Sequence, residues 1–293
     1  MKLTASFFLA ILLLFAGCEK EEPAISQLLE VEFDGKTTTF INEDLSANEN
    51  CGRIFINASA VTNKFNSSFH ISLDITRDGH INSMLLVDYA DKNQHYKTAN
   101  YNAANVFSIR DYSYSPLDKS VTFEFDGTLY EADNPLNTKA LKGKVRLQHL
   151  YEHPCSYWPE VVKANINSAP FHAVKHTGRG TTSITNRTAY SDDGYRISIV
   201  TAREIKEMPV GSYHFAKEDA TNRVMLEKYL GSPNANTYEP LWEQEWESYD
   251  YEGVLHILEQ TADPMPHTSG TFSFKAYQNN KLVYEVTGGK FSL

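Results

Sequence analysis

Apolar and polar residues alternate along many short stretches of this chain. Every second residue is apolar in FHISLDI at 69–75, and TFEFDG at 122–127 repeats the pattern. Side chains on a strand point alternately to opposite faces, so each stretch is expected to bury one face and expose the other to solvent. Turn residues in RDGH, SDDG and QNNK separate such stretches, which predicts antiparallel hairpins.

The second half of the chain repeats the first. The segments at 120–147 and 269–293 both begin Ser-x-Thr-Phe-x-Phe and end Gly-Lys-x-x-Leu. Two earlier pairs of segments match in the same order, 31–40 with 163–172 and 56–75 with 184–201. Three matches in register indicate a tandem duplication, with about eight short strands in each copy.

The predicted fold class is therefore all-β, with two tandem antiparallel β-sandwich or small barrel domains arising from an internal duplication. The first domain is placed at 28–150 and the second at 160–293, with a linker at 151–159. Pro154 and Pro159 favour a short, stiff connection. One segment, 216–230, fits either a short helix or a strand from Arg223 to Leu230.

The N-terminus predicts a lipid anchor. Residues 1–17 carry one early charge, Lys2, and an apolar run too short to span a bilayer, as in a signal peptide. The sequence LFAGC, ending at Cys18, resembles the lipobox of bacterial lipoproteins. This resemblance implies that Cys18 becomes the first residue and carries acyl chains such as palmitate on its sulfur and its amine. The alternative is an ordinary signal peptide with a chance cysteine.

Residues 18–27 are charged and lack apolar periodicity, as expected of a flexible tether. Within them, Lys20, Glu21 and Glu22 resemble the export signal that sends lipoproteins of Bacteroidota to the cell surface. That resemblance implies an outer-membrane protein anchored on the outer face. Without a working export signal, the same anchor would leave the protein facing the periplasm.

A wider resemblance covers nearly all of the second repeat. KANINSAPFHA, MPVGSYHF and the closing SGTFSF…GGKFSL are similar to the uncharacterised β-rich lipoprotein domains common in Bacteroidota. The first repeat is more divergent, because Val121 replaces Gly270 and no clear Gly-x-Tyr-x-Phe is present. The resemblance implies an extracytoplasmic lipoprotein with a β fold and brings no catalytic residues.

The charge of the chain argues against some partners. The formal net charge is −10, and loss of Lys2 with the signal peptide leaves 26 basic and 37 acidic residues. Nucleic acid and anionic lipid headgroups both need a basic surface, so neither is expected as a partner.

Two cysteines remain once Cys18 is acylated. An extracytoplasmic compartment permits a disulfide between Cys51 and Cys155, while two unpaired thiols fit the sequence equally well.

No metal, cofactor or catalytic site is predicted. The candidate ligand sets are His149 with His153, His172 with His176, and Asp88, Asp91 and Asn93. Four residues of a strand span about 13 Å, which separates the two histidines of each pair. The acidic set lacks the glycine and the closing glutamate of a calcium loop. Nucleophile elbows, phosphate-binding loops and the His-Glu-x-x-His motif are absent from the sequence.

The most unusual composition lies at 238–252, YEPLWEQEWESYDYE. On a strand Trp242 and Trp246 share one face, and Tyr249 and Tyr251 follow. These four aromatic residues fit an exposed platform for a sugar or a protein partner. The favoured alternative is that they fill the core, since alternation is ordinary for a half-buried strand.

Two functional classes follow. The preferred one is a non-enzymatic lipoprotein of the outer membrane that binds a protein partner or a glycan. The competing class is a lipid-anchored hydrolase of surface polymers, whose paired carboxylates would leave no local trace in the sequence.

Overall fold

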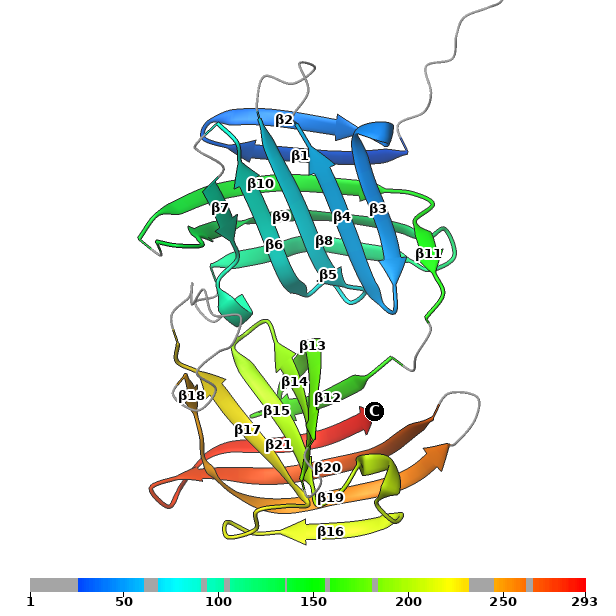
Figure 1. Ribbon diagram of the computed structural model, residues 1–293, viewed down its shortest axis with the longest axis vertical. Coiled ribbons are helices and arrows are strands. Elements are labelled where there is room, and N and C mark those ends of the chain that lie inside the picture. The colour runs from blue at the N-terminus through cyan, green and yellow to red at the C-terminus, as the bar shows by residue number, and fades with distance from the viewer. Residues whose placement is uncertain are drawn as a thin grey trace, which may run out of the picture.

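A computed structural model describes residues 26–60, 68–90, 94–102, 106–134, 136–155, 159–180, 184–231, 245–261 and 266–293. These residues form two β domains, one above the other in Figure 1, and almost all of their regular structure is strand. The predicted all-β fold with two tandem domains is confirmed.

The first domain is an eleven-stranded sheet in the described residues. Its strands are β1 (Gln27–Phe33), β2 (Lys36–Ile41), β3 (Leu45–Asn50), β4 (Arg53–Ser59), β5 (Phe69–Thr76), β6 (Ile81–Asp88), β7 (Gln94–Lys97), β8 (Phe107–Ser115), β9 (Ser120–Glu131), β10 (Thr138–Leu147) and β11 (Tyr151–His153). Short 3₁₀ helices η1 (Asn42–Asp44) and η2 (Asn100–Asn102) interrupt them. Strands β3–β6 lie across β1, β2 and β8–β10, so the sheet folds back over its own core (Figure 1).

The second domain is a ten-stranded antiparallel sheet in the described residues. Its strands are β12 (Val161–Ile166), β13 (Ala169–Gly180), β14 (Thr185–Ser191), β15 (Tyr195–Thr201), β16 (Gly211–Phe215), β17 (Arg223–Tyr229), β18 (Trp246–Glu247), β19 (Asp250–Thr261), β20 (His267–Gln278) and β21 (Lys281–Ser292), with the 3₁₀ helix η3 (Ile205–Glu207). Of the two structures that fit 216–230, the strand is the one that forms, as β17.

The two domains share one order of hydrogen-bonded strands, as a duplication predicts. In the first domain β3 to β7 follow one another across the sheet, and β13, β14, β15, β17 and β18 do so in the second. Likewise β2-β1-β10-β9 corresponds to β13-β12-β21-β20. The long strand β13 therefore takes the place of both β2 and β3. Each domain has more strands than the eight expected, partly because short pairings such as β18 carry little sequence signal.

The repeated Gly-Lys-x-x-Leu motif has a packing reason. Gly143 and Gly289 occupy equivalent positions in the last strand of their repeats, and a phenylalanine ring covers each of them. A Cβ at Gly143 would lie 2.3 Å from Cζ of Phe125, and one at Gly289 would lie 2.3 Å from Cδ2 of Phe272. Both distances are far below van der Waals contact, so only glycine leaves room for the ring.

The cores follow the predicted alternation. All four apolar residues of FHISLDI are at most 1% exposed, and the polar residues between them are half-buried. Phe123 and Phe125 join them in the core of the first domain. Phe215 of β16, which belongs to the Gly-x-Tyr-x-Phe motif, packs on Phe274 in the second core, with ring centroids 6.3 Å apart.

The predicted linker begins inside the first domain. Its residues 151–153 form β11, which pairs parallel with β3. The backbone then leaves towards β12 of the second domain (Figure 1).

Candidate functional site

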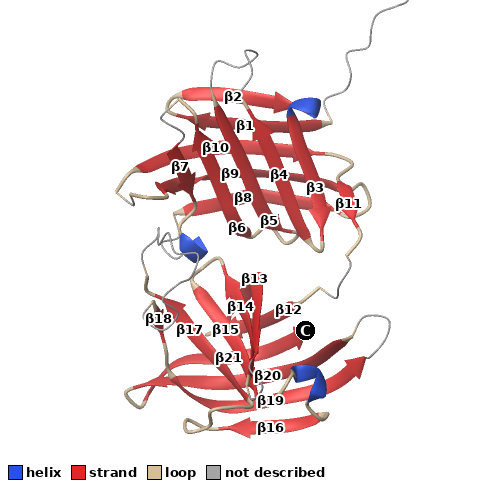
Figure 2. Ribbon diagram, in the orientation of Figure 1, coloured by secondary structure: helices blue, strands red, loops and turns tan. Residues whose placement is uncertain are grey.

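An aromatic cluster joins the two domains. The 3₁₀ helix η2 lies on the side of the first domain that faces the second (Figure 2). Its Tyr101 packs against Tyr190, Tyr229 and Trp246 of the second domain. Its ring centroid lies 5.1 Å from Tyr190, 5.1 Å from Tyr229 and 5.0 Å from Trp246. The first pair is stacked and the other two are close to edge-on, which are the arrangements that aromatic rings prefer. The cluster therefore fixes one contact between the domains.

The backbone at Tyr101 is adapted to this contact. Its φ of 53° and ψ of 21° lie in the left-handed region, which a bulky residue rarely enters. Such a conformation persists only where surrounding contacts outweigh its cost of about 1–3 kcal/mol. The three ring contacts supply that compensation, aided by the hydrogen bond that Asn100 Nδ2 donates to the Tyr229 hydroxyl over 3.3 Å.

A cavity of about 420 Å³ lies beside the cluster, between the domains. The first domain lines it with Arg53, Asn82, Ser83, Lys97 and residues 98–101, and the second with Val174, Lys175, Thr177, Tyr190, Tyr229 and Glu245. Small-molecule sites typically enclose about 300–1,000 Å³ and favour domain interfaces. The size and place of the cavity therefore suit a small ligand.

The lining of the cavity is polar and charged. Arg53 is fixed by Asp74, to whose Oδ1 its Nε donates over 3.0 Å, and Asn82 donates to the other oxygen of Asp74 over 2.7 Å. Burial lowers the pKa of Lys97, because the ammonium group is partly removed from water. Burial also raises the pKa of Tyr101, so its phenol stays protonated.

A second cavity of about 190 Å³ adjoins the first and shares Thr177 and Tyr190 with it. The Thr177 hydroxyl donates to that of Tyr190 over 3.3 Å. Behind them Arg196 forms a buried ion pair with Glu227, 2.5 Å from Nε to Oε2, and its guanidinium lies 4.3 Å from the ring centroid of Trp246. The ion pair therefore fixes the guanidinium of Arg196 against Trp246, one ring of the aromatic cluster.

Histidines form another contact between the domains. His80, in the turn before β6, stacks on His172 of β13 with ring centroids 4.0 Å apart. Its Nδ1 donates to Asp192 Oδ2 over 3.2 Å. The bond to Asp192 raises the pKa of His80, whereas burial, followed by the charge of His80, lowers the pKa of His172. The stack therefore accommodates one positive charge, on His80.

His176, on the same strand as His172, makes the free energy of folding depend on pH. Burial, with the charge of Arg53 as a smaller cause, lowers the pKa of His176 to about 4. The folded state therefore holds His176 neutral, while the unfolded state takes up a proton below about pH 6.5. We expect this residue alone to cost about 3 kcal/mol of folding free energy as the pH falls from about 6.5 to about 4. Replacement by glutamine should remove that loss, as measured by urea unfolding at about pH 7 and about pH 4.5.

His80 supplies the matched control, because its pKa is raised instead. Its stabilising charge is present below about pH 6.5 and is lost as the pH rises through its pKa in the folded state. His80→Gln should therefore cost more stability at about pH 5 than at about pH 8. Equal acid sensitivity of the wild type and His176→Gln would contradict a neutral, buried His176.

Comparison with family models, curated proteins and solved structures finds no match to this chain. In the described part of the chain, no helix has the length and apolar character needed to cross a bilayer.

The exposed aromatic platform considered for 238–252 is not formed by its described members. Trp246, Tyr249 and Tyr251 are 5%, 8% and 4% exposed, so a binding surface is wrong for these three, and the favoured alternative, in which they are buried, is confirmed for them. Trp246 belongs to the aromatic cluster, and the two tyrosines belong to the core of the second domain. Trp242 lies outside the described residues.

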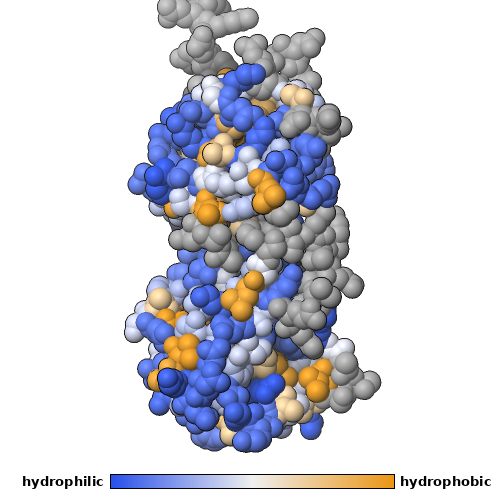
Figure 3. All heavy atoms as spheres, turned by 90° about the vertical axis from the view of Figure 1, so that its left-hand side faces the viewer, coloured by the Kyte–Doolittle hydropathy of each residue, from blue (hydrophilic) through white to orange (hydrophobic). Residues whose placement is uncertain are grey.

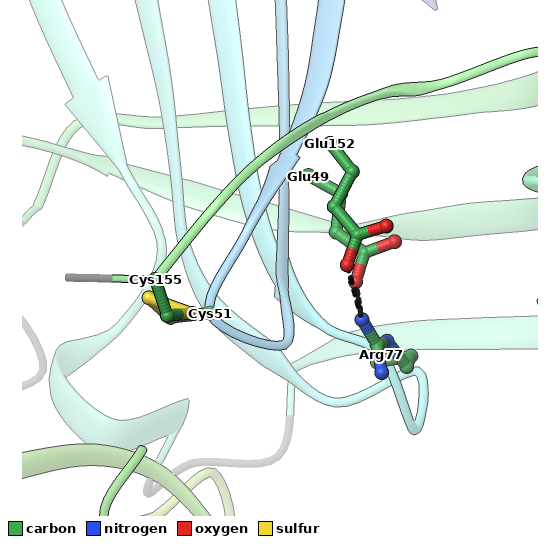
Figure 4. Close-up of a disulfide and its surroundings, with 5 residues drawn as sticks. All are labelled: Glu49, Cys51, Arg77, Glu152 and Cys155. Atoms are coloured by element: carbon green, nitrogen blue, oxygen red, sulfur yellow. Dashed lines mark ion pairs between the residues drawn. A yellow bond between two sulfur atoms is a disulfide. The ribbon is translucent and has the colours of Figure 1, made fainter. Parts of the chain in front are cut away.

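The other predicted residues divide into two groups. Cys51 and Cys155 form a disulfide that ties the end of β11 to the turn between β3 and β4 (Figure 4). Close by, Arg77 pairs with buried Glu49 and lies 3.7 Å from Glu152.

The predicted lipid-attachment and export residues lie outside the described residues: Cys18, Lys20, Glu21 and Glu22. No group of three or more metal-ligating side chains gathers among the residues that the structure describes.

Sequence reasoning missed the residues of the domain interface. Tyr101, Lys97 and Lys175 stand in segments without a distinctive motif, and they meet only through the packing of one domain on the other. The one local signal is the asparagine on each side of Tyr101, because asparagine is common in turns that require unusual backbone angles.

The outer surface is a weaker candidate for a binding site than the interdomain cavity. On the face shown in Figure 3, apolar residues form separate small patches and not one continuous area. Scattered apolar residues of this kind are normal on protein surfaces.

Proposed function

We propose that this protein is a lipid-anchored lipoprotein of the outer membrane that captures a saccharide in the cavity between its domains. The anchor rests on the lipobox at Cys18, and the outward orientation rests on Lys20, Glu21 and Glu22. The tether after Cys18 would hold both domains clear of the membrane.

The observation that carries the proposal is the interdomain cavity and its lining. Saccharides bear a hydroxyl group on most carbons, so a site for them needs many hydrogen-bond donors and acceptors. Amides, hydroxyl groups and charged groups from both domains face this one space, including Asn82, Ser83 and Thr177. A recess of this size suits a small ligand or the end of a glycan better than a protein, whose interfaces are broad and shallow.

A binding role is favoured over hydrolysis of glycans. Glycosidases need two carboxyl groups about 5–10 Å apart on either side of the scissile bond. Among the described residues that line the cavity, Glu245 is the one carboxylate. The lining therefore supports recognition of a saccharide without cleavage.

The test is a glycan array probed with the soluble chain, in which Cys18 is replaced by serine. Ser83 lies exposed on β6 and lines the cavity, so Ser83→Trp should fill the space without disturbing the core. We expect the wild-type soluble chain to bind glycans and the Ser83→Trp variant to bind them at least about tenfold more weakly.

Ser46→Trp is the matched control, because Ser46 is an exposed strand serine of the same domain that does not line the cavity. It should keep full binding. Absence of any glycan signal, or equal binding by both tryptophan variants, would contradict the proposed site. A stoichiometric outer-membrane protein that co-purifies, combined with a silent array, would favour an accessory subunit instead.

A further inference from the structure

The second cavity lies on the face of the second domain's sheet that points away from its core. Strands β13, β14 and β15 are neighbours in this sheet. On the outward face Thr177 lies opposite Thr188, and Thr188 lies opposite Ser198. Residues directly opposite one another in an antiparallel sheet share a face. Ala189 and Ile197, the next residues along their strands, belong to the core instead.

The two cavities follow one another on this outward face. Thr177 and Tyr190 line both of them. The interdomain cavity extends from this pair to Lys175, whereas the second cavity extends to Arg179, at the other side of Thr177 on β13. A strand rises about 3.3 Å per residue, so Lys175 and Arg179 are about 13 Å apart along it. The lined surface therefore continues from the first domain well along the second.

The second cavity is lined by hydrogen-bond donors that the fold leaves unused. Arg196 donates to Glu227 through Nε alone. Its two terminal amino groups bond to no residue in the described ranges, although its side chain is only 12% exposed. Asn186 accepts from the Thr188 hydroxyl through Oδ1 over 2.9 Å, and its amide nitrogen likewise bonds to no described residue. A recessed donor without a partner is costly, so these groups suit acceptor atoms of a ligand.

We propose that the bound saccharide is a chain of at least two sugar units, whose end lies in the interdomain cavity and whose next unit lies in the second cavity against Asn186 and Arg196. The inference rests on the proposed function, since it extends the same site. Hydroxyl and ring oxygens of a sugar accept hydrogen bonds from amide and guanidinium groups. Met225 adds an apolar side chain to the same lining, and binding sites usually combine apolar surface with a few polar groups.

The experiment titrates the soluble Cys18→Ser chain with a ladder of free oligosaccharides cut from the glycan that binds most tightly on the array, starting from the single sugar. Isothermal titration calorimetry should show that affinity rises at least about tenfold from the single sugar to the longer members and then levels off. Free oligosaccharides are needed because an array displays many copies, which raises the apparent affinity without any new contact.

Asn186→Ala is the first variant to test, since it removes the unused amide from a half-buried strand position. It should remove most of the gain in affinity with length. Met225→Trp, which fills the second cavity, should do the same. Asn57→Ala is the matched control, because Asn57 is also a half-buried strand asparagine and lines neither cavity. It should keep the full dependence on length.

The outcomes separate the two proposals. Affinity that does not depend on length, yet is abolished by Ser83→Trp, would overturn the second sugar position and leave the saccharide site standing. Full dependence on length in both Asn186→Ala and Met225→Trp would also overturn it. A chain that binds no glycan would contradict both proposals together.

Discussion

Replacing Cys18 with serine should move the protein completely from the membrane fraction to the soluble fraction. The thioether to diacylglycerol cannot form on a serine, and each methylene buried in a bilayer contributes about 0.8 kcal/mol. Two or three acyl chains hold a protein on a membrane almost permanently, so their loss leaves no comparable attachment. Fractionation of cells that express the two forms at equal levels measures the effect.

Cys51→Ser is the matched control for this experiment, because it removes a cysteine without touching the lipobox. It should stay with the membrane. Substitution of Lys20, Glu21 and Glu22 by alanine should also retain the anchor while moving the protein from the cell surface to the periplasmic face, as shown by protection from added protease. Unchanged membrane retention of Cys18→Ser would refute the lipoprotein assignment.

Loss of the Cys51–Cys155 disulfide should lower the free energy of unfolding by about 4 kcal/mol. The bridge joins residues 104 positions apart, so it removes a large amount of loop-closure entropy from the unfolded chain. It also fastens β11 beside β3, where the backbone leaves for the second domain. Urea unfolding of Cys51→Ser/Cys155→Ser, compared with the oxidised protein in the soluble Cys18→Ser background, measures the change.

Reduction of the soluble chain by dithiothreitol is an independent check, since it should reproduce the double substitution and have no effect on the double variant itself. A difference below about 1 kcal/mol would show that the bridge constrains the unfolded chain little. Weakened glycan binding by the double variant would show in addition that the domain interface depends on the fastening of β11.

Much of the fold could be predicted from sequence because its determinants are local. Period-two alternation in FHISLDI identifies a half-buried strand without knowledge of its partner. The repeated Gly-Lys-x-x-Leu marked equivalent strands because each copy needs a glycine beneath a phenylalanine ring, as Gly143 and Gly289 show. The sequence pattern could not determine the order of the strands in the sheets. It also could not decide between strand and helix for β17, because both depend on pairing between distant segments.

The candidate site could not be predicted because its residues meet only across the domain interface. Arg53, Lys97, Lys175 and Glu245 are far apart in the chain and line one cavity. The aromatic run at 238–252 was recognised as unusual, yet its composition cannot distinguish an exposed face from a buried one. Trp246 packs against Tyr101 of the other domain, so its role became clear only from the arrangement of the two repeats.

The most direct test of binding between the domains is hydrogen exchange of the soluble chain with and without the glycan that binds most tightly on the array. A ligand in the interdomain cavity should slow exchange at Ser83, along 97–101 and at Thr177 and Tyr190, on both walls of the cavity. Protection confined to other surfaces, with these residues unchanged, would contradict the claim that the ligand binds between the domains.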